Sequence, residues 1–300
     1  MRLPLVAIFT AGLVGCSSPS SDHPPIAPKP DAATVDSPPA VDAPTAADIP
    51  PAVDAPPAVD APPAVDAPSA VDAPPARLRV LFIGNSYTYV NDLPALLARM
   101  ADAASRAGHG PTLAVDSVTV GGATLRNHWD TGTAPARIMA GGWDAVVLQG
   151  QSVEPLLNPT EYRTYGARFA TLAVERGARP VLYATWPRRA GDAVYAQPWS
   201  GQTPDGFNTR MQSVCGALAA VSMSTLAPVG DAWMASLRAR PTLDLYDPDG
   251  SHPSAAGSWL AACVIYRALT GRPAPSEAEP AATGLSPADA RFLRELTASP

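Results

Sequence analysis

Two short stretches, far apart in the sequence, carry side chains suited to nucleophilic catalysis. Ser86 directly follows Gly84 and Asn85 at the end of an apolar run. A serine hydroxyl is a weak nucleophile at neutral pH and needs a base that takes its proton. Near the other end of the chain, Asp249 stands three residues before His252. At this spacing a carboxylate can accept the imidazole N–H and leave the other ring nitrogen as the base that a serine nucleophile needs.

Each stretch also has an ordinary structural interpretation. A serine after a strand often caps a helix or closes a turn, and a histidine can stabilise a helix end. Pro253 is typical of a first helical turn, which places His252 at the start of a helix. The positive end of the helix dipole would favour the neutral imidazole there, while Asp249 would stabilise the imidazolium once it forms.

The region from residue 77 onward alternates between apolar runs and amphipathic segments. Strands that alternate with helices imply a parallel sheet with right-handed crossovers. We expect an α/β domain, a three-layer α/β/α sandwich with five parallel strands in the order 2-1-3-4-5. Ligands of such sheets lie at the carboxyl ends of the strands. The expected strands are 78–84, 112–120, 145–148, 180–184 and 226–229, and the expected helices are 92–104, 159–175, 205–221 and 253–269.

The polar residues after these strands resemble the sequence blocks of the SGNH, or GDSL-like, hydrolase superfamily. Gly84-Asn85-Ser86 is similar to the first block, G-D/N-S, and Asp249-Gly250-Ser251-His252 is similar to the last, D-x-x-H. The second block of the family contributes a glycine N–H, and Gly122 matches it best. The resemblance extends over residues 78–271 and implies a serine esterase with a Ser-His-Asp triad.

The third block departs from the pattern of the superfamily. Where G-x-N-D is usual, this chain has Leu148-Gln149-Gly150-Gln151-Ser152, and this LQxQS sequence resembles a bacterial branch of the superfamily. Gln151 can donate the amide N–H of the usual asparagine from a longer side chain, and Gln149 and Ser152 are rival candidates. The resemblance thus implies an oxyanion hole made by the N–H groups of Ser86 and Gly122 and by the Gln151 side chain. It implies no metal or other cofactor.

Four residues beside these blocks are candidates for substrate contact, namely Asn85, His128, Trp129 and Trp186. A tryptophan at the rim of the site would suit a sugar, which favours acyl esters on carbohydrates. A surface position for His128 beside a core Trp129 explains the same pattern equally well. Arg188, in the stretch after the fourth strand, either pairs with an anionic substrate or lies solvated in a loop.

Two other functions fit the same sequence. The first is a non-catalytic module that binds glycans or another ligand on this fold, because the usual asparagine of the third block is missing. The second is an acyltransferase that uses Ser86, His252 and Asp249 on an alcohol acceptor.

The first 76 residues predict an export signal followed by a spacer. Residues 1–16 combine a basic start, a short apolar run and the ending Leu13-Val14-Gly15-Cys16, and they resemble a bacterial lipoprotein signal with a lipidated cysteine. Residues 17–76 hold 17 of the 36 prolines and repeats of Ala-Val-Asp-Ala-Pro-Pro. Such a segment lacks the large apolar residues of a core and is expected to be disordered. We therefore expect an exported lipoprotein, anchored to a membrane through Cys16, with its folded domain at 77–300.

The acidity of the chain belongs to the expected spacer. The formal net charge is −6, and residues 17–76 alone carry nine Asp against one Lys. Residues 77–300 carry 19 Arg against 18 acidic residues. A domain so close to neutral gives no support for a nucleic-acid partner.

The expected domain holds two cysteines, and export would permit a disulfide between them. Cys215 lies on the helix before the fifth strand, and Cys263 lies on the helix at 253–269, expected to be the last. In a 2-1-3-4-5 sheet these two helices pack on opposite faces. We therefore predict two buried free thiols.

Overall fold

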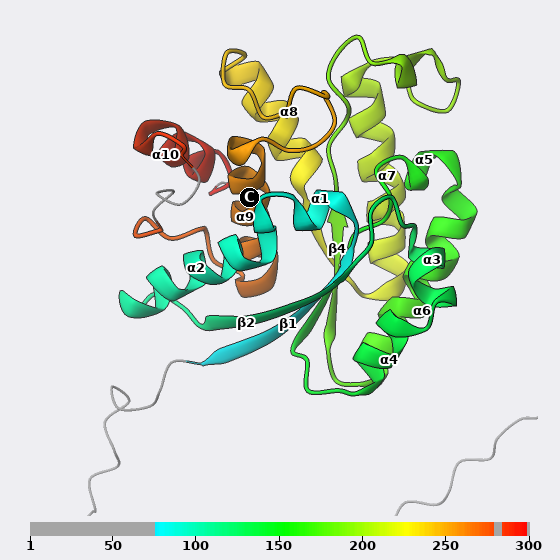
Figure 1. Cartoon of the computed structure of the whole chain (residues 1–300), viewed down its shortest axis with the longest axis vertical. Coiled ribbons are helices and arrows are strands. Elements are labelled where there is room, and N and C mark those ends of the chain that lie inside the picture. The colour runs from blue at the N-terminus through cyan, green and yellow to red at the C-terminus, as the bar shows by residue number, and fades with distance from the viewer. Residues whose placement is uncertain (1–75, 279–283, 299–300) are drawn as a thin grey trace, which may run out of the picture. The chain divides into compact units, whose positions relative to one another are not determined.

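The structure, a computed structural model, describes residues 76–278 and 284–298. These residues form a parallel sheet with helices on both faces (Figure 1). The predicted signal sequence with Cys16, and the predicted spacer apart from Ala76, lie outside the described residues. Within the described ranges, the structure contains no helix that combines the length and the hydropathy needed to cross a membrane.

The sheet has the predicted strand order, β2-β1-β3-β4-β5, and all four pairings are parallel. The last residues of β1 and β4, and the whole of β3, are buried. Strands covered on both faces are apolar at successive positions, which is why these three appear in the sequence as unbroken apolar runs. The strands are β1 (Arg77–Gly84), β2 (Thr112–Thr119), β3 (Ala145–Leu148), β4 (Arg179–Ala184) and β5 (Thr225–Pro228).

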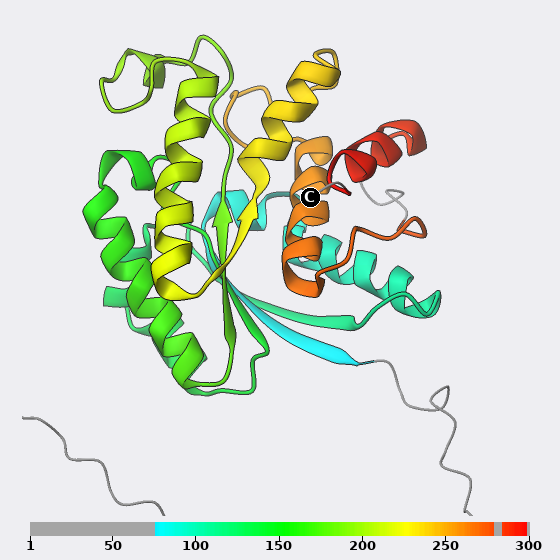
Figure 2. The same ribbon diagram turned by 180° about the vertical axis from the view of Figure 1, so that it is seen from behind.

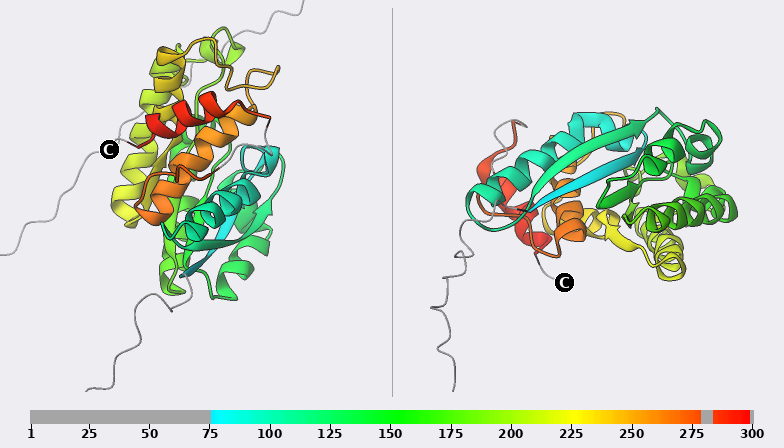
Figure 3. Two further views of the ribbon diagram at one scale, coloured as in Figure 1. Left: turned by 90° about the vertical axis from the view of Figure 1, so that its left-hand side faces the viewer. Right: turned by 90° about the horizontal axis from the view of Figure 1, so that it is seen from below.

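Two layers of helices cover the two faces of the sheet (Figure 1, Figure 2 and Figure 3). Along β1, Val80 and Phe82 enter one hydrophobic core, and Leu81 and Ile83 enter the other, as the alternation of a strand requires. The first core is closed by α2 (Leu93–Arg106), α8 (Val229–Ala239), α9 (Ala255–Thr270) and α10 (Pro287–Leu296). The second is closed by α3 (Leu125–Asp130), α4 (Thr133–Met139), α5 (Glu154–Leu157), α6 (Pro159–Glu175) and α7 (Pro204–Ser222). Short helices also lie at α1 (Ser86–Tyr89), η1 (Val90–Asp92) and η2 (Ala193–Ala196).

Two predictions about the last part of the chain are wrong. Helix α9 begins at Ala255, because the side chain of Ser254 caps it by accepting the Gly257 N–H. Pro253 forms an antiparallel bridge with Tyr246 instead of entering the helix. His252 therefore precedes the helix cap, and the helix dipole does not act on it as at a first turn. A further helix, α10, follows α9 and packs in the same core.

The two cysteines are free and buried, as predicted. Cys215 on α7 belongs to one core and Cys263 on α9 belongs to the other. The sheet separates them, which confirms the argument from topology.

Candidate active site

The carboxyl ends of the strands bring most of the predicted residues to one cavity. Ser86 follows β1, Gly122 follows β2 and Gln151 follows β3, while Asp249 and His252 lie in the loop between α8 and α9. The cavity has a volume of about 330 Å³. It is lined by Asn85, Ser86, Tyr87, Gly122, Gln151, Ser152, Arg188, Asp249, Ser251 and His252.

Ser86, His252 and Asp249 form a continuous hydrogen-bonded series. The Ser86 Oγ lies 2.9 Å from His252 Nε2, and His252 Nδ1 lies 2.5 Å from Asp249 Oδ2. The carboxylate can only accept here, so the ring donates from Nδ1 and keeps Nε2 free to accept the serine proton. This is the geometry that activates a serine nucleophile.

The Asp249 carboxylate is held in place by more than the imidazole. Its other oxygen accepts the backbone N–H groups of Ser251 and His252, each at 2.9 Å. Partial desolvation is the largest single influence on the Asp249 pKa and would raise it. The hydrogen bonds from the His252 ring and the two backbone groups outweigh this influence and lower the pKa to about 2. The carboxylate therefore stays ionised and can stabilise an imidazolium.

Trp186 supports the loop that carries Asp249 and His252. It is 1 % exposed and does not line the cavity, so its prediction as a substrate contact is wrong. Its ring stacks between Tyr87 and Trp233, with centroids 4.6 and 4.1 Å away, and its Nε1 donates to the Ser251 carbonyl at 3.0 Å. The flat indole fixes the loop of His252 relative to the helix that Ser86 begins.

His128 and Trp129 also lie away from the cavity. His128 is buried, and its Nε2 donates to the Gly84 carbonyl at 2.8 Å. Burial lowers the pKa of His128, and this hydrogen bond opposes the shift. The rings of Trp129 and Phe169 pack edge to face, with their centroids 5.1 Å apart. The predicted aromatic rim for a sugar is therefore wrong, and His128 instead fixes the end of β1.

Asn85 lines the cavity, but its amide is fully engaged. The Asn85 Nδ2 donates to the carbonyls of Ala123 and Gly150, at 3.1 and 3.3 Å. Its Oδ1 accepts from the Tyr87 N–H and from Gln149 Nε2. Asn85 thus links the loops after β2 and β3, and its predicted contact with substrate is replaced by a positioning role.

Gln149, the first rival for the oxyanion hole, lies beneath the site. It is fully buried, and its Oε1 accepts from the Asn85 N–H and the Thr88 hydroxyl, both at 2.9 Å. A Cβ at Gly84 would lie 2.6 Å from this oxygen, which explains why only glycine fits there. Gln149 therefore holds the first block in place and cannot reach the cavity.

Gln151 remains the better candidate for the third oxyanion donor. Gln151 lines the cavity, and because its Oε1 accepts the Val153 N–H at 2.9 Å, its Nε2 is the atom that can donate to a substrate. That nitrogen contacts the hydroxyl of Ser152, the other rival, at 3.2 Å. An amide N–H aimed at a developing oxyanion is the chemistry that the missing asparagine would supply.

Substituting Gln151→Ala should therefore lower kcat by about 100- to 1000-fold, the usual effect of removing one oxyanion donor. The melting temperature should change little because the side chain is only half-buried. Gln149→Ala is the matched comparison, and it should instead lower the melting temperature because it leaves the buried Asn85 N–H and Thr88 hydroxyl unpaired. Steady-state kinetics and thermal melts measure both effects. A Gln151→Ala enzyme with nearly normal kcat would mean that Ser152, or backbone groups alone, donate the hydrogen bonds to the oxyanion.

Glu154 is a feature of the site that the sequence did not reveal. The side chain is 1 % exposed, and one carboxylate oxygen accepts the N–H groups of Gln151 and Leu125, at 2.9 and 3.3 Å. The other oxygen has no hydrogen-bond partner among the described residues. Burial raises the pKa of Glu154 to about 7, against the effect of the two N–H groups. A glutamate within the apolar run Val153–Leu157 was the available sign of this buried carboxyl.

Glu154 should make the stability of the domain depend on pH. Because its pKa is higher in the folded state, the folded chain retains a proton between about pH 4.5 and about pH 7 that the unfolded chain releases, so stability falls as the pH rises through this window. The pKa shift corresponds to a decrease of about 3 kcal/mol in the free energy of unfolding across this window. Glu154→Gln keeps the acceptor oxygen and should lose this decline. Urea unfolding across the window, with the exposed Glu175→Gln as control, measures it, and parallel profiles for wild type and Glu154→Gln would contradict it.

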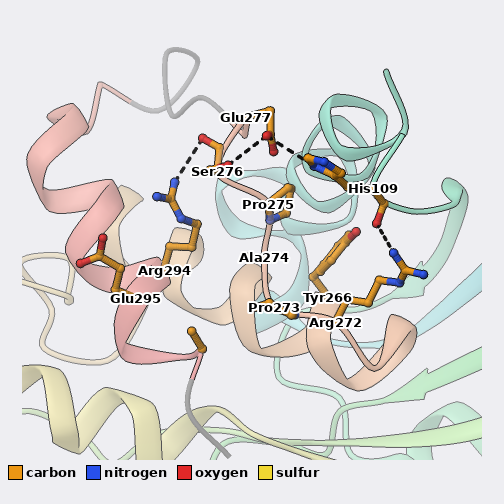
Figure 4. A pocket seen from close by; sticks show the side chains of 11 residues that line it. His109, Tyr266, Arg272, Pro273, Ala274, Pro275, Ser276, Glu277, Arg294 and Glu295 are labelled. Carbon is orange, nitrogen blue, oxygen red and sulfur yellow. Dashed lines mark hydrogen bonds and ion pairs between the residues drawn. The ribbon is translucent and has the colours of Figure 1, made fainter. Parts of the chain in front are cut away.

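A second hollow, of about 470 Å³, lies beside α10 (Figure 4). Its serine and histidine both contact the Glu277 carboxylate, Ser276 Oγ at 3.0 Å and His109 Nδ1 at 3.4 Å, and they do not contact each other. Arg294 and Arg272 donate to the backbone carbonyls of Ser276 and His109. The residues that line this hollow therefore offer no pair of nucleophile and base.

Comparisons with known proteins agree with the fold. No protein-family model matches the chain, and no curated protein matches it. Among solved structures, a protein of Slackia heliotrinireducens assigned to the SGNH hydrolases is 35% identical, with a TM-score of 0.55, over 64% of this chain and 99% of that one. A DUF4886 family protein from Bacteroides uniformis is 17% identical, with a TM-score of 0.60, over 74% of this chain and 93% of that one, and shares the fold. Since the first match extends over almost the entire length of that protein, this chain belongs to the SGNH hydrolase superfamily.

Proposed function

We propose that this hydrolase is a serine esterase in which Ser86 is the nucleophile, His252 the general base and Asp249 the partner of the imidazole. The hydrogen-bonded series from Ser86 Oγ through His252 to Asp249, at 2.9 and 2.5 Å, is the observation that carries the proposal. Its open end faces a cavity at the carboxyl edge of the sheet, where a substrate can approach.

The reaction proceeds in two halves. The Ser86 Oγ attacks the ester carbonyl while His252 Nε2 takes its proton, and the new oxyanion accepts hydrogen bonds from the N–H groups of Ser86 and Gly122 and from the Gln151 amide. His252 then gives the proton to the departing alkoxide, which leaves an acyl group on Ser86. Water, activated by the same imidazole, attacks this acyl-enzyme and releases the acid.

The lining of the cavity supports a short acyl group, such as acetyl, on a polar alcohol. Apart from Gly122, every lining residue bears a polar group, and none of them is aliphatic. A long fatty acyl chain needs an apolar groove to offset its transfer from water, and these residues do not form one. A hydroxyl-rich alcohol such as a carbohydrate suits polar walls, although the tryptophans expected to stack on a sugar lie elsewhere.

We also propose that the enzyme is exported and attached to a membrane by a lipid on Cys16. The supporting features are the apolar run and small residues before Cys16 and the proline-rich segment after it. In this proposal residues 17–76 hold the catalytic domain away from the membrane surface.

Hydrolysis of simple esters tests the proposed function. The full chain, purified in detergent, should hydrolyse 4-nitrophenyl acetate, and kcat/KM should fall from acetate through butyrate to octanoate. A fluorophosphonate should inactivate it with one label per chain, and mass spectrometry should find the label on the peptide that contains Ser86. A purely binding module would show neither activity nor labelling, and a label on another residue would contradict the assignment of the nucleophile.

A further inference from the structure

Arg188 brings a positive charge into the site cavity. It lies in the loop that follows β4, is half-buried, and lines the same cavity as Ser86 and His252. Its Nη2 donates to the Ser152 hydroxyl at 3.0 Å, while its Nε is buried and has no hydrogen-bond partner in the described part of the chain. The guanidinium therefore has hydrogen-bonding capacity that the surrounding protein does not use.

No carboxylate of the described residues forms an ion pair with Arg188. The neighbouring Arg189 differs, because its Nη2 lies 2.9 Å from Asp244 and its guanidinium is exposed. The one carboxylate that lines the cavity, Asp249, already accepts the His252 ring and two backbone N–H groups. Arg188 is thus a cation of the site without an anionic partner of its own.

The loop holds Arg188 in a defined place. The Tyr195 hydroxyl donates to the Arg188 carbonyl. On the side of the cavity, the Ser152 Oγ that accepts from Arg188 also accepts from Gln151 Nε2, so the guanidinium lies next to the proposed oxyanion donor. Burial raises the pKa of Tyr87, which also lines the cavity, and the charge of Arg188 is the largest influence that opposes this shift.

The buried Nε is closed off from the cavity, but Nη1 also has no hydrogen-bond partner in the described part of the chain, and a partly desolvated guanidinium with unused N–H groups is costly unless a ligand completes its hydrogen bonds. Its planar array of donors matches a carboxylate, which it can bind through two parallel hydrogen bonds. A neutral ester offers these N–H groups no charged acceptor, whereas a carboxylate of the substrate could accept from Nη1 and Nη2 together. Such an arrangement would favour an anionic ester over a neutral one.

We propose that Arg188 binds a carboxylate of the substrate, so that the preferred substrates are short acyl esters that carry an anionic group on either the alcohol or the acyl side. The inference rests on the proposed esterase function and names a substrate class for it. Arg188 is a specificity-determining residue in this scheme, since it binds a part of the substrate that does not react.

Two matched pairs of esters test the proposal. One pair has the charge on the alcohol, as acetyl esters of 4-hydroxybenzoate and 4-hydroxybenzamide. The other has it on the acyl group, as the 4-nitrophenyl esters of adipate and of methyl adipate. Arg188→Met should lower kcat/KM for the carboxylate member of at least one pair about 10- to 100-fold more than it lowers kcat/KM for the neutral member. Arg188→Lys should retain part of the preference, and Arg176→Met, an exposed arginine at the far end of α6, should leave it intact.

Equal loss on both members of each pair would overturn the proposal, because it would show that Arg188 acts by holding Ser152 and Gln151. If Arg188→Met kept the wild-type kcat/KM on both members of each pair, this would overturn the proposal as well. Calorimetry separates this failure from that of the esterase function. The Ser86→Ala chain should bind 4-hydroxybenzoate or adipate more tightly than 4-hydroxybenzamide or dimethyl adipate, and Arg188→Met should abolish the difference. A wild type that hydrolyses none of the esters but keeps this Arg188-dependent binding would refute the esterase proposal and support the anion site.

Discussion

Ser86→Ala should lower kcat for short-chain esters by about 10⁵- to 10⁶-fold, the loss usual when a serine nucleophile is removed. The hydroxyl is the only group at the site that the proposed mechanism makes covalent with the acyl carbon. Its removal should leave the fold intact, because Asn85, and not Ser86, caps α1 through its contact with the Tyr87 N–H. Thermal melts of the variant should therefore match those of the wild type, while steady-state kinetics show the loss.

His252→Ala and the double variant Ser86→Ala/His252→Ala extend this test. A nucleophile and its base act as one unit, so the double variant should be about as slow as either single variant. If the effects multiplied instead, the two side chains would act independently, and the 2.9 Å contact between Oγ and Nε2 would have no catalytic meaning. Ester hydrolysis by Ser86→Ala within about 100-fold of wild type would place the nucleophile elsewhere.

The sequence predicted the sheet and the central residues of the site for related reasons. Strands buried on both faces give unbroken apolar runs, and the polar residues that end them, such as Ser86 and Gln151, must meet at the carboxyl edge of a parallel sheet. Asp249 and His252 are only three residues apart, so their contact depends on one tight turn and on no distant partner. The prediction of this contact therefore does not depend on where the neighbouring helices begin and end.

The direction of single side chains was not predictable in the same way. Trp186 follows a strand at the correct edge, but its orientation is set by Tyr87 and Trp233, which stack on its two faces from distant parts of the sequence. Asn85 could equally face the substrate, until the carbonyls of Ala123 and Gly150 are known to lie within reach of its amide. Such roles depend on how loops after different strands pack, which no local pattern encodes.

The start of α9 and the burial of Glu154 illustrate two further limits. Pro253 fits a first helical turn, but its bridge to Tyr246 and the cap at Ser254 shift the helix beyond it. Glu154 begins a short helix, where a glutamate would ordinarily be exposed, and only the approach of Leu125 and Gln151 explains why it is buried. In both cases a contact across the fold overrides a reasonable local preference.

Asp249→Asn should lower kcat by about 10³- to 10⁴-fold without disturbing the loop. The asparagine keeps a carbonyl oxygen that can accept the N–H groups of Ser251 and His252, as the wild-type Oδ1 does at 2.9 Å. Its amide N–H, however, takes the place of the oxygen that accepts from His252 Nδ1. The ring must then accept at Nδ1 and carry its proton on Nε2, so it cannot take the proton of Ser86.

Asp247→Asn is the matched control, because it removes a carboxylate from the same loop without touching the imidazole. It should leave kcat within about threefold of wild type. The pKa of Asp249, lowered to about 2, means that the carboxylate remains ionised down to strongly acidic pH, and the support it gives to folding is lost only as the pH falls from about 4 towards 2. The loss of kcat in Asp249→Asn should therefore persist from mildly acidic to neutral pH, where the melting temperature of Asp249→Asn should lie below that of the wild type because the amide lacks the support of the ionised carboxylate. Nearly normal turnover by Asp249→Asn would mean that His252 keeps its reactive tautomer without Asp249, whereas a similar loss in Asp247→Asn would mean that the net charge of the loop, and not the position of the proton on the ring, determines the rate.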